Sequence, residues 1–150
     1  MKSFKNILIA EDDIDDYQFL AGALEQISSE FTIKKATNGL QLMGYLNSSE
    51  RPDIVFLDLN MPVKNGIATL QLIRAIPEFT TIPVVIYSTS NHPKTIDEAY
   101  KHDATYYMVK PDAVPVIVEQ LLYVFNRLLA NESKPSRHDF VVAIKKHVQS

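Results

Sequence analysis

The sequence contains no cysteine, carries little net charge and has no long hydrophobic run. Without cysteine the chain can form neither disulfides nor thiolate metal sites, and its redox compartment stays undecided. A formal net charge of −3 over 150 residues argues against a nucleic-acid-binding surface spread over the whole molecule. The amino-terminal stretch MKSFKNILIAEDD has a short apolar run followed by acids. It is too short for a signal peptide or a membrane span, so we expect a cytoplasmic protein without a membrane partner.

Short apolar runs alternate with amphipathic stretches as far as Leu129. This alternation predicts an α/β domain, a parallel sheet with helices on both faces. The predicted strands are Phe4–Ala10, Phe31–Ala36, Ile54–Leu57, Pro83–Ser88 and Thr105–Val109. The predicted helices are one capped by Asp15 or Asp16, one after Asn38-Gly39, one from Gly66 to before Pro77, Pro93–Lys101 and Val114–Leu129. The second strand is the most polar, so we place it at an edge of the sheet.

The composition changes after Leu129. Residues 130–139 are polar and contain a proline, which is typical of a linker. Phe140–Val148 has apolar residues at helical spacing, but helices below ~12–15 residues are marginal in isolation. We therefore predict one domain over residues 1–129, followed by a linker and a short helical extension over residues 130–150, which packs on the domain or a partner, or frays.

The helix predicted over Val114–Leu129 is apolar on more of its circumference than a core-facing helix needs. At 100° per residue its apolar positions span about 160°, against the ~100° of a core-facing stripe. The surplus centres on Leu122 and Leu129. A second subunit, a downstream target or the chain's own tail could cover it, and a homodimer and the tail rank equally.

Acidic side chains follow two of the predicted strands. Asp58 comes directly after Ile54–Leu57, and Glu11, Asp12 and Asp13 follow the first strand. If these strands are neighbours, their acids meet at the carboxyl edge of the sheet, where ligands bind in open α/β folds. Two carboxylates ~4 Å apart repel by roughly 4 kcal/mol at an effective dielectric of 20, so we expect either a bound cation or carboxyl groups that keep their protons. An all-oxygen ligand set suits Mg²⁺; alternatively, the acids simply begin a helix.

Two further polar residues end the fourth and fifth strands. Ser88 could donate its hydroxyl to a group attached to Asp58, and Lys110, which precedes Pro111, could neutralise carboxylate or phosphoryl charge. Either residue alone could be an ordinary surface side chain. An acid triplet, an aspartate, a serine and a lysine at the ends of four strands together indicate a functional site.

The motifs ILIAEDD, LDLNMPVKNG, PVVIYSTS and YYMVKP resemble the receiver domain of two-component response regulators, from Lys5 to about Leu129. The resemblance implies a doubly wound, flavodoxin-like five-stranded parallel sheet of order 2-1-3-4-5. It implies that Asp58 is the phosphoacceptor. The implied Mg²⁺ ligands are Glu11, Asp12, Asp13, Asp58 and the backbone carbonyl of Asn60, with Asp12 favoured over Asp13 as a direct ligand.

The resemblance also implies how the signal is produced. Ser88 would contact the phosphoryl group, Lys110 would stabilise its charge, and the Lys110–Pro111 bond would be cis. Tyr107 matches the family's aromatic switch residue, although Tyr106 lies beside it. Phosphorylation would draw Ser88 inward and let Tyr107 turn into the vacated space, altering the surface of the fourth helix, fifth strand and fifth helix.

Three positions depart from the family pattern. Thr89 replaces a residue that is usually small, which could crowd attacking water. Asp103 replaces a glycine, and aspartate tolerates the positive φ that such a position requires. Glu11 replaces an aspartate and keeps its charge.

The sequence thus predicts a non-enzymatic, single-domain response regulator, whose LDLNMP variant is similar to stand-alone receivers partnered with phytochrome-like kinases. A histidine kinase or a phosphotransfer protein would phosphorylate it, and output would run through another protein. A non-phosphorylated receiver-like adaptor and a phosphorelay intermediate are the alternatives. An aspartyl-phosphate hydrolase would need a general acid where Asn60 stands, and an FMN carrier would not place Glu11-Asp12-Asp13 beside its phosphate.

Overall fold

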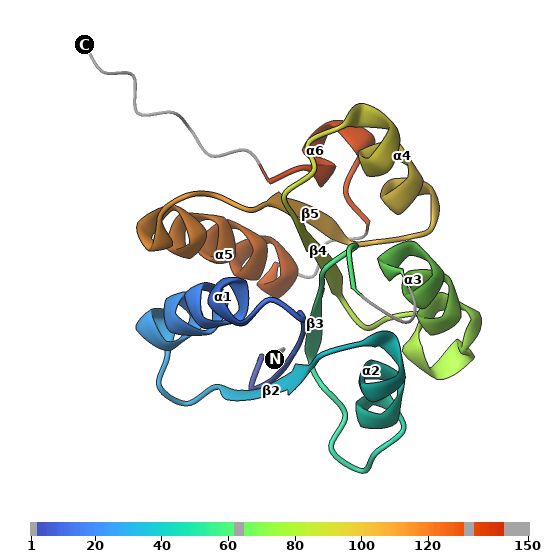
Figure 1. The fold of residues 1–150 in the computed structure, drawn as a ribbon, viewed down its shortest axis with the longest axis horizontal. Helices are drawn as coiled ribbons and strands as arrows, with labels where there is room; N and C mark the ends of the chain where they lie inside the picture. Colours follow the sequence, from blue (N-terminus) through green and yellow to red (C-terminus); the bar gives the residue numbers. More distant parts are fainter. Residues whose placement is uncertain (1–2, 62–64, 131–133, 143–150) are drawn as a thin grey trace.

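A five-stranded parallel sheet forms the centre of the molecule, in the order β2-β1-β3-β4-β5 (Figure 1). The computed structural model describes residues 3–61, 65–130 and 134–142. The strands are β1 (Asn6–Ala10), β2 (Thr32–Ala36), β3 (Ile54–Leu57), β4 (Val84–Ser88) and β5 (Tyr106–Val109). The predicted fold class and strand order are confirmed, and the predicted strand ends differ by no more than two residues.

Helices cover both faces of this sheet (Figure 1). Helices α1 (Ile14–Ile27) and α5 (Val114–Leu129) lie on one face, and α2 (Gly39–Leu46), α3 (Gly66–Ala75) and α4 (Pro93–Lys101) lie on the other. A 3₁₀ turn, η1 (Pro77–Phe79), follows α3, and a short helix, α6 (Arg137–Phe140), lies near α4. No helix in the described part of the chain has the length and apolar character needed to span a membrane.

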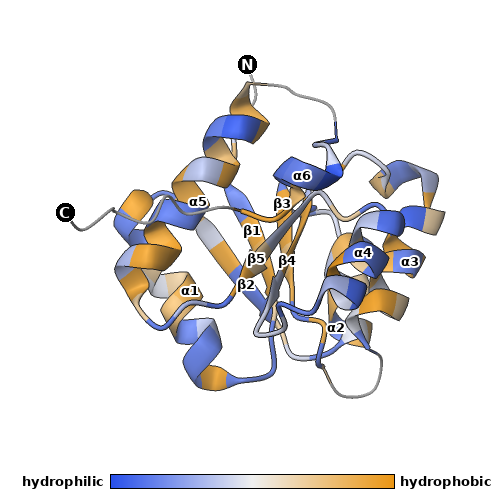
Figure 2. Ribbon diagram, turned by 90° about the horizontal axis from the view of Figure 1, so that it is seen from above, coloured by the Kyte–Doolittle hydropathy of each residue, from blue (hydrophilic) through white to orange (hydrophobic). Residues whose placement is uncertain are grey.

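The alternation of side chains along each strand divides the core into two parts. In β3, Val55 and Leu57 face the layer of α2, α3 and α4, whereas Ile54 and Phe56 face α1 and α5. Figure 2 shows hydrophobic strands at the centre of the molecule, between helices that carry both hydrophilic and hydrophobic residues. Strand β2 is only partly buried, because it lies at the edge of the sheet as predicted.

The cap of α1 differs from the prediction. Neither Asp15 nor Asp16 caps this helix; the carboxylate of Asp13 accepts a hydrogen bond from the N–H of Asp16 at 2.9 Å. Helix α1 begins at Ile14, directly after Asp13, so only Asp13 has the extended backbone of a cap. The carboxylate of Asp16 is thereby left for another contact.

Asp103 has a φ of 67°, the only positive φ of a non-glycine residue in the described ranges. The sequence placed this aspartate where the family has glycine and predicted that it tolerates such a conformation, which is confirmed. Lys134 lies 2.9 Å from its carboxylate.

The helix predicted over Phe140–Val148 is wrong at Val141 and Val142. Helix α6 ends at Phe140, and Val141 instead forms an isolated parallel bridge with Tyr107 of β5. The edge of β5 offers hydrogen bonds that the local helical spacing does not reveal, and tertiary contacts override a weak local preference. Residues 143–150 lie outside the described residues, and the boundary at residue 129 stays a prediction.

The surplus apolar face of α5 is exposed, with Leu122 at 43% and Leu129 at 49% of their full accessible surface. The described part of the tail packs at β5 and does not bury them. A second subunit, a downstream target and the tail beyond Val142, which lies outside the described residues, all stay predictions.

Candidate functional site

Asp58 lies where β3 reaches the carboxyl edge of the sheet. Its N–H donates to the carbonyl of Ala10 at 3.0 Å, which continues the β1–β3 ladder by one residue. Its side chain is 6% exposed, and its Oδ1 accepts a hydrogen bond from the N–H of Asn60 at 3.2 Å. The Asp58 carboxylate is therefore almost fully buried and accepts a hydrogen bond from one backbone N–H.

The first helical residue of α3 packs directly behind this loop. The N–H of Gly66 donates to the carbonyl of Leu59 at 2.9 Å. A Cβ at Gly66 would lie 2.4 Å from the Leu59 Cα and 2.6 Å from the Asp58 carbonyl oxygen. Only a residue without a side chain fits here without moving the backbone of Asp58.

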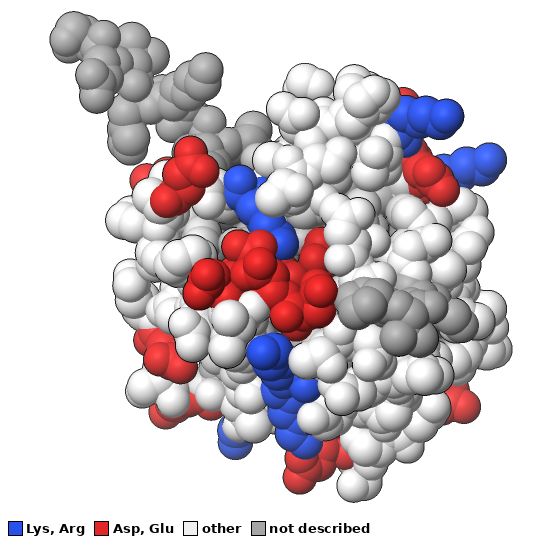
Figure 3. Space-filling model, viewed as in Figure 1, with Lys and Arg blue, Asp and Glu red and all other residues white. Residues whose placement is uncertain are grey.

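Three acids meet at this edge, as the adjacency of β1 and β3 requires. Oxygen atoms of Glu11, Asp12 and Asp58 all lie within 4.8 Å of one another. Glu11 is buried, and its Oε2 accepts from the N–H of Asp13 at 3.3 Å, whereas Asp12 is exposed. Figure 3 shows acidic side chains gathered near the centre of this face with basic side chains beside them. A donor set of carboxylate oxygens alone, open on the side of Asp12, fits a hard divalent cation that keeps some of its waters.

Two other predicted ligands are placed differently. The carboxylate of Asp13 caps α1 and is not a member of the three-acid group. Asn60 is exposed, and its N–H points to Asp58. The metal-ligand roles of Asp13 and of the Asn60 carbonyl stay predictions.

Lys110 reaches the acids from the end of β5. Its Nζ lies 2.6 Å from Glu11 Oε1, 2.8 Å from Asp16 Oδ2 and 3.8 Å from Asp58 Oδ2. The ammonium also lies 5.2 Å from the centre of the Tyr87 ring, and the Lys110 N–H donates to the Ser88 carbonyl at 2.8 Å. The buried Lys110 ammonium thus lies near Asp58, the predicted phosphoacceptor, but its shortest contacts are with the carboxylates of Glu11 and Asp16.

The proximity of these groups shifts their proton affinities. Burial, together with hydrogen bonding to Asp58, raises the pKa of Glu11 to about 8, although Lys110 acts in the opposite direction. Burial alone would lower the pKa of Lys110, but hydrogen bonds to Asp16 and Glu11 raise it above its ordinary value. The cluster therefore stabilises additional positive charge, either as protons or as a cation.

Ser88 ends β4, and Tyr107 lies in the neighbouring strand β5. Ser88 is buried, and its Oγ accepts from the N–H of Ser90 at 3.2 Å. Tyr107 is also fully buried, and its hydroxyl donates to the Ser90 carbonyl at 2.8 Å. Tyr106 belongs to the core on the opposite face of the sheet, beside α1 and α5. Of the two tyrosines, only Tyr107 adjoins the loop after Ser88.

The cis bond implied between Lys110 and Pro111 is wrong. No peptide bond in the described residues is cis, and this pair is among them. The trans form is favoured even before proline, by about 0.5–1 kcal/mol.

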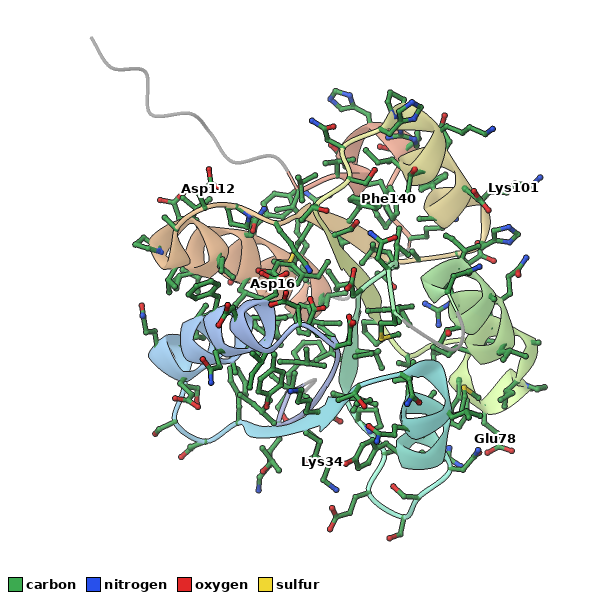
Figure 4. All side chains as sticks on the ribbon, in the orientation of Figure 1. Asp16, Lys34, Glu78, Lys101, Asp112 and Phe140 are labelled. Carbon is green, nitrogen blue, oxygen red and sulfur yellow. The ribbon has the colours of Figure 1, made fainter. Side chains whose placement is uncertain are left out.

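Sequence reasoning missed the contact of Asp16 with Lys110 and the ring of Tyr87 beneath the ammonium. The position of Asp16 in α1 could have indicated this contact. With Asp13 as the cap, Asp16 lies in the first turn of the helix, close to the carboxyl ends of the strands. Figure 4 labels Asp16 near the middle of this face. Tyr87 precedes Ser88 in an apolar strand, and its sequence context carried no such signal.

Comparisons with known proteins agree with this geometry. The family model described as "Response regulator receiver domain" matches residues 7–122. Response regulator Rcp1 of Synechocystis is 30% identical over 71% of this chain and 76% of its own length. The nitrate/nitrite response regulator NarL of Escherichia coli is 34% identical over 79% of this chain, which spans about half (54%) of NarL.

Solved structures give the same result. A response regulator of red light signalling, RPA3017 of R. palustris, has a TM-score of 0.77 at 28% identity, with 88% of this chain and 99% of that chain covered. The phosphorylated cyanobacterial phytochrome response regulator RcpA has a TM-score of 0.77 at 27% identity, with coverages of 89% and 100%. The Mn²⁺-bound form of Rcp1 has a TM-score of 0.74 at 26% identity, with coverages of 88% and 99%. With the strand order, the three-acid group and the match over residues 7–122 in agreement, this chain belongs to the response regulator receiver domain family.

Proposed function

We propose that this protein is a response regulator that accepts a phosphoryl group on Asp58 from a phosphohistidine, with Mg²⁺ bound, and signals through altered protein–protein contacts. The donor would be a sensor histidine kinase or a phosphotransfer protein. The observation that carries the proposal is the setting of Asp58, whose carboxylate lies 3.8 Å from the Lys110 ammonium and within 4.8 Å of oxygens of Glu11 and Asp12.

Glu11, Asp12 and Asp58 are the residues that would hold Mg²⁺, as far as the described side chains allow. Their oxygen-only donor set suits this ion, which binds few carboxylates and keeps several waters. The ion would supply positive charge to the transferring phosphoryl oxygens. The Mn²⁺-bound form of Rcp1 is a similar protein with a divalent metal.

The chemistry uses the Asp58 carboxylate as a nucleophile. A carboxylate oxygen forms a bond to phosphorus as the bond from phosphorus to the donor's imidazole nitrogen breaks. The imidazole keeps the electron pair of that bond, and Asp58 becomes an acyl phosphate. Phosphoryl transfer asks the protein mainly for position and charge, which the buried Lys110 ammonium supplies from one side. Attack of water on phosphorus later releases inorganic phosphate and restores the carboxylate.

The response runs through Ser88 and Tyr107. The Ser88 hydroxyl would turn toward the phosphoryl oxygens, and Tyr107, whose ring is already buried in this structure, would be stabilised inside. The added phosphoryl charge would thereby shift the equilibrium between two conformations of Ser88 and Tyr107. A homodimer through the exposed face of α5 stays a prediction.

The test is phosphoryl uptake from acetyl phosphate, followed by intact-protein mass. The wild type should gain one phosphoryl group only with Mg²⁺, and Asp58→Asn should gain none. Asp15→Asn, which changes an exposed aspartate of α1, is the matched control and should behave as wild type. Uptake that persists in Asp58→Asn contradicts the proposal, and no uptake by the wild type favours the non-phosphorylated adaptor. Transfer of the phosphoryl group onward to a second histidine would identify a relay intermediate.

A further inference from the structure

The segment Lys134–Val142, called here the C-terminal segment, lies against the edge of β5 next to α4 (Figure 1). The N–H of Val142 donates to the carbonyl of Tyr107 at 2.9 Å, and Val141 pairs with Tyr107 in a parallel bridge. The segment thus continues the sheet by one bridge beyond its last strand. Its attachment point is the residue that the resemblance implies to be the switch.

An aromatic contact accompanies this bridge. Phe140 is fully buried, with its ring centre 5.0 Å from that of Tyr100 and 6.1 Å from that of Tyr107, in edge-to-face arrangements. Figure 4 labels Phe140 in the interior between α6 and α4. Tyr100 also donates its hydroxyl to the Pro135 carbonyl at 2.9 Å. Such aromatic pairs contribute about 0.5–1.5 kcal/mol each beyond the apolar area that they bury.

Charged contacts close the outer side of the segment. Lys134 lies 2.9 Å from Asp103 and donates to the Tyr100 carbonyl at 2.7 Å, and Arg137 lies 2.7 Å from Asp97. These ion pairs are exposed, and exposed pairs contribute little to stability. Docking of the segment therefore depends chiefly on Phe140 and the bridge to Tyr107.

Tyr107 also belongs to the chain of contacts that leads to Asp58. Its hydroxyl donates to the Ser90 carbonyl, and the Ser90 N–H donates to Ser88 Oγ. Ser88 in turn accepts, through its carbonyl, from the N–H of Lys110. One buried side chain is thus in contact with Phe140 on one side and with the Ser88 loop on the other.

We propose that the C-terminal segment is an internal positioning element that holds Tyr107 in its buried conformation and is thereby coupled to phosphorylation of Asp58. This inference rests on the proposed function. Phe140 packs edge-to-face against the Tyr107 ring in the same core cluster, so loss of its ring removes a contact that favours the buried conformation of Tyr107. A phosphoryl group that draws Ser88 toward itself favours the buried ring, and the buried ring favours the docked segment.

Coupling of this kind is reciprocal. Phosphorylation should tighten docking of the segment, and docking should raise the affinity of the site for a phosphoryl group. The surface that a partner of the phosphorylated protein contacts would then include the C-terminal segment as well as α4 and β5.

The experiment measures amide hydrogen exchange of Val142 in the full chain, with and without beryllofluoride, a phosphoryl mimic, in the presence of Mg²⁺. Exchange should slow about fivefold or more when the mimic binds, which is within the usual range of coupling between sites. Unchanged exchange despite bound beryllofluoride overturns the inference and leaves the proposed function standing. Failure of beryllofluoride to bind overturns both.

Variants test the reverse direction. Phe140→Ala should speed exchange at Val142 and weaken beryllofluoride binding about fivefold, while circular dichroism keeps the spectrum of the folded wild type. Leu72→Ala, which changes an exposed leucine of α3, is the control and should change neither quantity. If Phe140→Ala does not fold, Arg137→Ala, which removes only an exposed ion pair, should produce the same two changes in smaller amount. Unaltered beryllofluoride affinity in a folded variant with faster Val142 exchange contradicts the coupling.

Discussion

Replacement of Gly66 by alanine tests whether the start of α3 fixes the position of Asp58. Gly66 has no positive φ, so its backbone conformation does not require glycine. It requires space, because an added Cβ would meet backbone atoms of Leu59 and Asp58 at 2.4 and 2.6 Å. These atoms belong to the backbone of Asp58 and of the next residue, so they cannot move without displacing the Asp58 carboxylate.

The expected magnitude follows from this overlap. Overpacking in a well-packed region typically costs about 1–3 kcal/mol, and here the colliding atoms are backbone. Gly22→Ala in α1 and Gly44→Ala in α2 are matched controls, because nothing lies within 4 Å of an added Cβ at either position. Both should stabilise the protein, since alanine in a helix interior is favoured over glycine by about 0.5–1 kcal/mol.

The assay combines urea unfolding with the rate of phosphoryl uptake from acetyl phosphate. Gly66→Ala should lower the free energy of unfolding and slow uptake together, while the two controls should raise stability and keep the wild-type rate. A Gly66→Ala protein that is as stable as the controls and takes up phosphate at the wild-type rate would refute the reasoning.

Three further outcomes concern the buried charges. Burial raises the pKa of Glu11 from its ordinary value of 4.5 to about 8. The metal-free folded protein therefore binds more protons than the unfolded chain in this range. Stability should fall as pH rises from 4.5 to 8, with a slope of at most about 1.4 kcal/mol per pH unit, and Glu11→Gln should remove this slope in urea titrations. Lys110→Met should slow phosphoryl uptake by about a hundredfold, because it removes a positioned positive charge; an unchanged rate would contradict the role of the ammonium. Asp16→Asn should cost no more than about 1 kcal/mol in urea unfolding, since the carboxylate is 31% exposed and such pairs are weak.

The sequence predicted the helices and strands well where turn residues or prolines beside each element mark its ends. Ile54–Leu57, Pro93–Lys101 and Val114–Leu129 match the structure residue for residue, because each is an apolar or amphipathic run bounded by turn residues or prolines. The meeting of the acids of β1 and β3 could be foreseen because parallel strands place their carboxyl ends at one edge.

Two of the misses arise from contacts between residues far apart in the sequence, and the cap of α1 arises from the path of the chain. In EDDIDD several acids could cap α1, and only the path of the chain leaving β1 selects Asp13. The bond between Lys110 and Asp16 joins residues 94 positions apart. The bridge of Val141 to Tyr107 likewise depends on a free strand edge, which local helical spacing cannot reveal.

The most direct test of the central claim is to locate the acyl phosphate chemically. Protein phosphorylated with acetyl phosphate and Mg²⁺ is treated with borohydride, which reduces an aspartyl phosphate to homoserine, and the peptides are sequenced by mass spectrometry. The account predicts homoserine at position 58 and at no other aspartate. Homoserine at Asp12 or Asp13 with Asp58 intact, or phosphate found on a histidine or serine instead, would contradict it.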